Sequence, residues 1–275
     1  MSMSLWIVIL LAVVQGLTEF FPVSSSGHLV ILEALFGTRQ GNAQAGLIFE
    51  IAVHLGTLGA VIIFYRAKVI LLCRAFLATV SSGKGGYEKY RNEMRYIGLV
   101  ILGTMPAGVI GVLFHDQVEA TFDSPSLSAL FLVATGIYLL MTRMRAVRGS
   151  LGWQTALIIG VAQAIAILPG CSRSGWTIAT GLLLGVGFAE AAEYSFMLSI
   201  PAILGALVLT LVKEPGVLSA GSLAPLAIGA AAAFLTGLVA LKLLIGILNR
   251  GGFHRFAYYL LPVGLAAFFY FAIYA

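Results

Sequence analysis

The sequence is poor in charged residues: Asp, Glu, Lys and Arg make up only 10% of its 275 residues. Hydrophobic residues make up 60%, and the mean hydropathy is +1.02. A water-soluble domain of this length cannot bury so much apolar surface, so the composition excludes the soluble classes of protein and indicates a lipid environment.

Cysteine is also scarce, since the chain has only Cys73 and Cys171. Two cysteines so far apart exclude a disulfide framework or a cysteine metal cluster, and both are predicted to be packing residues. The first apolar run lacks the basic start and the small-residue cleavage site of a signal peptide, so we expect it to be retained. Short alternating segments, which would indicate a transmembrane barrel, are absent too.

Long apolar runs are what the sequence does contain. A hydrocarbon core of ~30 Å takes ~20 helical residues, and helices satisfy their own backbone hydrogen bonds in lipid. The pattern therefore predicts an all-α polytopic membrane protein with six transmembrane helices. We place them near residues 45–65, 97–115, 126–142, 191–212, 222–246 and 256–274.

Two further apolar regions are interrupted. Residues 5–21 are followed by a break from Pro22 to Gly27, and the arm 28–36 that follows would rise only about 14 Å as a helix. Residues 153–168 repeat this pattern, with a break from Pro169 to Gly175 and a short arm of 176–184. We predict two re-entrant helical hairpins, because irregular backbone at membrane depth needs protein or water around it.

The distribution of basic residues predicts the orientation. Three loops are basic, whereas the loop between the second and third spans is acidic, with Asp116, Glu119 and Asp123. The positive-inside rule puts the basic loops in the cytoplasm and both termini outside, and it explains the net charge of +5 without a nucleic-acid partner. The basic residues are Arg66, Lys68, Arg74, Lys84, Lys89, Arg91, Arg95, Arg143, Arg145, Arg148, Arg250 and Arg255.

The two interrupted regions are similar in sequence. Residues 14–17 and 24–27 match residues 162–165 and 172–175 at one constant offset. We therefore predict a single membrane domain, 1–275, made of two repeats of about 1–147 and 148–275. Each repeat has one hairpin and three spans, so the second repeat is inverted. Such folds usually have a polar site near the midplane, where the repeats meet.

The breaks carry residues suited to phosphate chemistry. Ser24–Ser26 and Ser172–Ser174 each precede a short predicted helix, and the start of such a helix favours an anion. Arg173 adds a planar fork that suits phosphate oxygens. An intramembrane carboxylate such as Glu19 is functional by default. His28 can act as a general acid or base, and Glu19 could orient it, accept a proton or hold a divalent cation.

Plainer interpretations stay open for several of these residues. The serines could be helix caps, and His28 could only bond a carbonyl group. Gln15 and Gln163 suit hydrogen bonds between packed helices. Glu50 and His54 lie four residues apart, as a pair that either lines the cavity or is purely structural.

Residues 15–28, QGLTEFFPVSSSGH, and residues 169–175, PGCSRSG, closely resemble the two signatures of the undecaprenyl-diphosphate phosphatases, the bacitracin-resistance proteins of bacterial membranes. The resemblance covers nearly the whole chain. It implies removal of the terminal phosphate of undecaprenyl diphosphate, which recycles the lipid carrier for peptidoglycan synthesis. It also implies a divalent metal, Mg²⁺ or Ca²⁺, a place in the bacterial cytoplasmic membrane, and a site open to the outer face.

Carried over by position, the resemblance implies a set of site residues. Its catalytic set falls on Glu19, Ser25, His28 and Arg173, with Glu19 also the candidate metal ligand. Gln15 occupies a Glu-or-Gln position, which weakens any scheme with two carboxylates on one metal, and His54 stands where the family more often has Gln. The expected substrate-binding residues are Ser24, Ser26, Gly27, Ser172, Ser174, Gly175, Thr177 and Gln15.

Several alternatives remain open from the sequence. The type 2 phosphatidic acid phosphatases also use a Ser-Arg element, but the His and Asp they need beyond it are missing after Arg173. A transporter or flippase of a polyprenyl phosphate, with a midplane anion site, would also suit inverted repeats. A lipid-binding scaffold would leave Glu19 and Arg173 without a purpose. The expected partners are the polyprenyl diphosphate and membrane lipids, and the sequence is compatible with a homo-oligomer.

The mechanism is also undecided by the sequence. Either Ser25 attacks the terminal phosphorus, activated by His28 or Glu19, or these groups activate a water molecule. In both routes, stabilisation of the phosphoryl charge is expected to matter most.

Overall fold

The structure is a computed structural model that describes residues 4–37, 43–144, 149–214 and 223–274. Within these ranges the chain is helical and has no strand, as predicted. Arg145 and Arg148, two of the predicted cytoplasmic residues, lie outside the described ranges.

Five helices are long and apolar enough to cross a membrane: α3 (Ala43–Phe64), α6 (Arg91–Leu113), α11 (Phe188–Lys213), α12 (Leu223–Asn249), and α13 (Ala257–Tyr274) together with the short 3₁₀ helix η3 (Phe253–Phe256). A sixth candidate is α8 (Pro125–Met141), which the 3₁₀ helix η1 (Thr142–Met144) follows. It forms a bent pair with α7 (His115–Phe122), at 97°. With 17 residues α8 rises about 26 Å, near the lower limit for a crossing. All six predicted spans therefore correspond to helices.

The two interrupted regions are helix–break–helix units. Helix α1 (Leu5–Thr18) and α2 (Ser25–Phe36) flank the first break, residues 19–24. Helix α9 (Trp153–Ile165) and α10 (Arg173–Leu183) flank the second break, residues 166–172. Both second arms begin three residues earlier than predicted, because each serine-rich motif forms the capped first turn of its helix rather than part of the irregular segment. Re-entry into the same membrane face stays a prediction.

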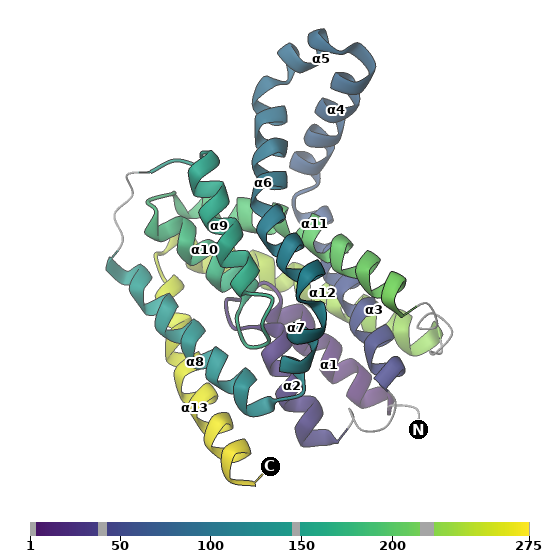
Figure 1. Ribbon diagram of the computed structural model, residues 1–275, viewed down its shortest axis with the longest axis vertical. Helices are drawn as coiled ribbons and strands as arrows, with labels where there is room; N and C mark the ends of the chain where they lie inside the picture. Colours follow the sequence, from purple (N-terminus) through teal and green to yellow (C-terminus); the bar gives the residue numbers. More distant parts are fainter. Residues whose placement is uncertain (1–3, 38–42, 145–148, 215–222, 275) are drawn as a thin grey trace.

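The segment after α3, predicted as a basic cytoplasmic loop, is helical nearly throughout. It consists of α4 (Arg66–Ser82), α5 (Lys84–Lys89) and the start of α6. In Figure 1 these helices project from the rest of the molecule.

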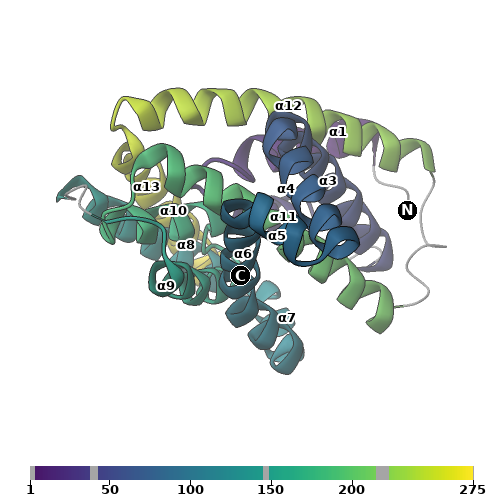
Figure 2. The same ribbon diagram turned by 90° about the horizontal axis from the view of Figure 1, so that it is seen from above.

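The helices pack across the two halves of the chain. Helix α1 packs on α12, α9 packs on α6, α3 packs on α12, and α8 packs on α13. Figure 2 shows α12 and α1 along one side of the molecule and α9 on the other. Gly16 allows α1 to approach α12, because a Cβ there would overlap Thr236 and the backbone of Ala233. Gly160 in the same way allows α9 to approach the backbone of Gly103 in α6. Small residues at such crossings are typical of helices packed in membranes.

Candidate active site

The first break places a carboxylate beside a serine-rich helix start. Glu19 directly follows α1 and is buried. Helix α2 begins at Ser25, and the Oγ of Ser24 caps it by accepting a hydrogen bond from the N–H of Gly27 (3.3 Å). Ser24 has φ 67°, the one positive φ outside glycine among the described residues. Such a conformation costs roughly 1–2 kcal/mol and is typical of functional sites.

The second break is fixed to α8 by Thr135. The Oγ1 of Thr135 donates to the carbonyl of Gly170 (3.0 Å) and accepts from the N–H of Ser172 (3.3 Å). Ser172 caps α10 by accepting from the N–H of Gly175 (3.1 Å). Gly170 has φ 94°, and a Cβ there would overlap the carbonyl oxygen of Ser128. Sequence reasoning missed Thr135, since nothing near it in the chain marks a partner of the second break.

The two breaks touch each other. The Oγ of Ser174 donates to the carbonyl oxygen of Phe21 (3.1 Å), which joins the start of α10 to the first break. A Cβ on Gly27 would lie 2.8 Å from the Cα of Gly170, so the absence of a side chain lets the two backbones approach. The two motifs singled out in the sequence therefore form one site.

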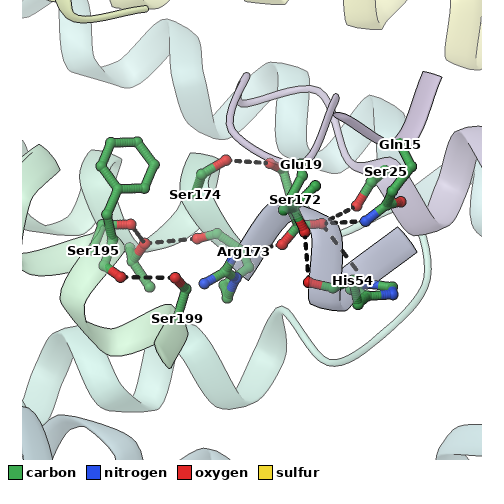
Figure 3. Close-up of polar contacts among 12 residues, drawn as sticks. Gln15, Glu19, Ser25, His54, Ser172, Arg173, Ser174, Ser195 and Ser199 are labelled. Carbon is green, nitrogen blue, oxygen red and sulfur yellow. Dashed lines mark hydrogen bonds and ion pairs between the residues drawn. The ribbon is translucent and has the colours of Figure 1, made fainter. Parts of the chain in front are cut away.

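Glu19 is at the centre of this site (Figure 3). Its Oε1 forms an ion pair with Nη2 of Arg173. Its Oε2 accepts hydrogen bonds from Nε2 of Gln15 (2.9 Å) and Oγ of Ser25 (2.7 Å). Nε2 of His54 lies 3.8 Å from the same oxygen. The structure thus brings together the acid and the guanidinium expected at the two breaks, while their catalytic roles stay predictions.

Two atoms around Glu19 are buried and have no hydrogen-bond partner among the described residues. They are Nη1 of Arg173 and Oε1 of Gln15. A buried polar atom without a partner costs about 1–3 kcal/mol, so each is suited to a ligand group. The guanidinium nitrogen suits an anion, and the amide oxygen suits a cation or a hydrogen-bond donor.

His28 has partners other than Glu19. Its Nδ1 lies 2.7 Å from the carbonyl oxygen of Ser24, and its Nε2 lies 2.8 Å from the hydroxyl of Tyr259, whose ring stacks on the imidazole. Because a carbonyl oxygen only accepts, Nδ1 carries a proton and Nε2 of a neutral His28 accepts from Tyr259. Sequence reasoning missed Tyr259, which lies in α13, 231 positions away.

The imidazole nearest Glu19 belongs to His54. Its Nδ1 lies 2.8 Å from the backbone carbonyl oxygen of Glu50, so it carries the proton there and directs Nε2 toward Glu19. The four-residue spacing of Glu50 and His54 predicted that they form a pair on one helix face. The observed contact of His54 is with the backbone carbonyl of Glu50.

The remaining predicted binding residues lie around the two helix starts. The hydroxyl of Ser26 lies 3.3 Å from that of Ser24, and the hydroxyl of Ser174 lies 3.3 Å from that of Ser172. Thr177 is buried and donates to the carbonyl of Arg173 (2.7 Å), and its hydroxyl also contacts Ser195 (2.6 Å). Thr177 thereby supports the first turn of α10, and Ser195 is a partner that the sequence did not reveal.

Ligands for a metal ion are few at this site. The described residues contain one group of three or more His, Cys, Asp or Glu side chains with ligand spacing, and it lies on α7, at His115, Asp116 and Glu119. That group is separate from the breaks, and Lys213 bonds Asp116 there (2.9 Å). Near the breaks, the groups that could coordinate a metal ion are the carboxylate of Glu19, Oε1 of Gln15 and Nε2 of His54.

Comparison with known proteins gives a consistent family. The chain matches the model of the family described as bacitracin resistance protein BacA over residues 8–266. It is 40% identical to an undecaprenyl-diphosphatase of Korarchaeum cryptofilum over 260 residues, covering 94% of this chain and 96% of that protein. It is 42% identical to one of Desulforapulum autotrophicum over 273 residues, covering 96% and 97%. One of Rhodopirellula baltica is 39% identical over 264 residues, covering 94% and 95%. With the family match and these relatives spanning nearly its whole length, the chain belongs to the bacitracin resistance protein BacA family.

Proposed function

We propose that the protein is a membrane phosphatase that hydrolyses undecaprenyl diphosphate to undecaprenyl phosphate and inorganic phosphate. The observation that supports this most directly is the contact of Glu19 with Arg173 and Ser25 where the two breaks meet. A carboxylate, a hydroxyl and a guanidinium in one buried site suit phosphoryl transfer, and relatives of similar length are named undecaprenyl-diphosphatases.

In this proposal the two helix starts hold the diphosphate. Helices α2 and α10 both begin at the site, so their dipoles favour an anion there. Nη1 of Arg173 is free to donate to a phosphate oxygen. The hydroxyls of Ser24, Ser26, Ser172 and Ser174 can rotate to donate. Gly27 and Gly175 let the chain pack closely at the two helix starts, since an added Cβ would meet Gly170 and Ser172.

The contact between Ser25 and Glu19 suggests how the reaction starts. The hydroxyl of Ser25 donates to Oε2 of Glu19, so Glu19 is placed to take its proton. The Ser25 oxygen would attack the terminal phosphorus while the bond from phosphorus to the bridging oxygen breaks and undecaprenyl phosphate leaves. Water would then cleave the phosphoserine. In the alternative route Glu19 deprotonates a water molecule, and Ser25 only binds the phosphate.

His28 is assigned a supporting role in the proton transfers. Its hydrogen bonds to Ser24 and Tyr259 fix the ring at the first turn of α2. From there the imidazolium form of His28, with a proton on both ring nitrogens, would protonate the departing phosphate.

We also propose that a divalent cation, Mg²⁺ or Ca²⁺, assists the reaction. Mg²⁺ is usually held by one or two carboxylates together with substrate phosphates, which matches a site with one carboxylate. The unpartnered oxygen of Gln15, beside Glu19, suits a hard cation as a second ligand. When bound, the ion would neutralise charge on the diphosphate oxygens.

The proposed setting is the bacterial cytoplasmic membrane, with both termini outside and the site open to the outer face. Two inverted repeats, 1–147 and 148–275, each contribute one re-entrant hairpin. The helix packing supports this arrangement. Helices α1 and α9, which precede the two breaks, pack on α12 and α6, and each of these is the second span of the opposite repeat. The reaction would recycle the lipid carrier for peptidoglycan synthesis and confer bacitracin resistance.

The decisive experiment measures phosphate release from undecaprenyl diphosphate by purified protein, with and without a chelator, beside Glu19→Gln. We expect release that the chelator suppresses and that Glu19→Gln reduces by at least 100-fold, as for loss of a general base. Ion-coupled movement of a polyprenyl phosphate across vesicles without phosphate release would instead identify a transporter.

A further inference from the structure

The projection formed by α4 and α5, residues 66–89, is joined to the membrane spans without linkers. A single residue, Tyr65, separates α3 from α4, and Tyr90 alone separates α5 from α6. Figure 1 shows the projection at one end of the molecule. Because α3 and α6 are both candidate spans, the projection must begin and end at the membrane boundary.

The surface of the projection is unusually apolar. Large hydrophobic side chains are exposed along α4, at Ile70, Leu71, Phe76, Leu77 and Val80. Between α4 and α6 lies an apolar groove of about 340 Å³. The groove is lined by Leu72, Cys73, Phe76, Leu77 and Ile97. An exposed apolar surface of this kind is unfavourable in water and indicates a binding surface or a lipid contact.

The same segment is strongly basic. Residues 66–95 contain seven Lys or Arg and two Glu. Lys68 forms an ion pair with Glu193 of α11 (2.9 Å), and its Nζ lies over the ring of Tyr96 in α6, 4.1 Å from the ring centroid. These contacts fix the base of the projection to the membrane spans. The other six are exposed. These are Arg66, Arg74, Lys84, Lys89, Arg91 and Arg95.

We propose that the projection is a lipid-binding element that takes an anionic phospholipid of the surrounding membrane. The groove accepts an acyl chain, and the negative headgroup is held by Arg74, adjacent to Cys73, and by Arg95, two positions before Ile97. Basic clusters beside a membrane span attract anionic lipids. A second copy is a poorer occupant of the same surface, because two projections with the same net positive charge repel each other. This inference is independent of the proposed reaction.

Cys73 offers a direct test, because it is exposed while Cys171 is buried. A nitroxide on Cys73 of the full-length protein, in vesicles of phosphatidylcholine and phosphatidylglycerol, should be several-fold more accessible to oxygen than to a water-soluble nickel complex. The control label sits at the tip, as Gly85→Cys in a Cys73→Ser background, where the site is open. We expect the reverse ratio there. Greater nickel accessibility at Cys73 would place the groove in water and overturn the proposal, as would strong spin coupling between two copies.

Lipid selectivity tests the charged part of the proposal. Spin-labelled phosphatidylglycerol should be retained by the protein in preference to spin-labelled phosphatidylcholine. The double variant Arg74→Gln/Arg95→Gln should weaken this preference on the order of 25-fold, since each basic residue near the surface contributes about fivefold. The matched control is Arg250→Gln/Arg255→Gln, which removes the same charge from another loop. Equal losses in both variants would show a general charge effect and reject the projection as the binding element.

Discussion

The two breaks have similar sequences but differ in which residue has a positive φ, and only a residue other than glycine is strained by it. In the first break the positive φ falls on Ser24, the cap residue itself. In the second it falls on Gly170, and the cap residue Ser172 has an ordinary φ of −71°. The second break is also fixed to the candidate span α8 by Thr135, whereas the backbone of the first break accepts a hydrogen bond from Ser174 of the short helix α10.

This difference suggests a division of labour between the repeats. The first break and the start of α2 hold the groups that would exchange protons, Glu19 and Ser25, beside the strained Ser24. The helix after the second break, α10, carries a permanent cation, Arg173, and is almost wholly buried. A rigid guanidinium needs no reorganisation when charge develops on a phosphoryl group, and that preorganisation is usually the largest contribution to catalysis.

Removing the guanidinium should produce the largest effect. We expect Arg173→Ala to lower the turnover of undecaprenyl diphosphate by on the order of 10³, as for other contacts to a transferring phosphoryl group. Steady-state phosphate release from the purified protein measures it.

Arg173→Lys is the matched control, since it keeps the charge but loses the planar fork. It should recover part of the rate. Because Arg173→Ala also leaves Glu19 buried without its ion pair, the stability of both variants must be compared. Near-normal turnover in Arg173→Ala would mean that the second break is not part of the active site.

Gly170 should be the most sensitive position for stability. Gly170→Ala places a Cβ at φ 94° and against the carbonyl oxygen of Ser128, so we expect a loss of about 3 kcal/mol in the free energy of unfolding. Titration with sodium dodecyl sulfate measures it. Gly98→Ala is the control, because Gly98 lies within α6 and no neighbouring atom lies within 4 Å of an added Cβ. If both variants unfold alike, the second break is less rigid than its contacts indicate.

Ser25 distinguishes the two chemical routes at the first break. If its oxygen attacks phosphorus, Ser25→Ala should lower turnover by at least 10², and rapid quenching of the wild-type protein should trap a phosphoserine. Ser26→Ala is the comparison variant, since Ser26 is a proposed phosphate-binding residue whose hydroxyl contacts Ser24, whereas that of Ser25 donates to Glu19. It should lower turnover less than Ser25→Ala. Full activity of Ser25→Ala would exclude the covalent route and leave activated water.

The sequence predicts more of the fold than of the contacts within the site. Long apolar runs predict the spans because lipid allows few alternatives to a helix. The repeated motif predicts that Glu19 and Arg173 meet, since inverted repeats bring equivalent segments together. The contacts of Tyr259 with His28 and of His54 with Glu19 depend on how distant helices pack, and no local pattern encodes that. The early helix starts were missed because a serine motif is compatible with both a turn and a capped first turn.

The smallest predicted effect concerns the two cap serines. Ser24→Gly loses the hydrogen bond to the N–H of Gly27 but relieves the strain of a positive φ, so the two contributions largely cancel. Ser172→Gly loses the equivalent bond to the N–H of Gly175 and relieves no strain, because its φ of −71° is ordinary. The added backbone entropy of the unfolded chain is common to both variants. We therefore expect Ser172→Gly to be the less stable variant by about 1 kcal/mol in the same detergent titration. Equal stabilities would show that the strain at Ser24 is not a real difference between the two breaks.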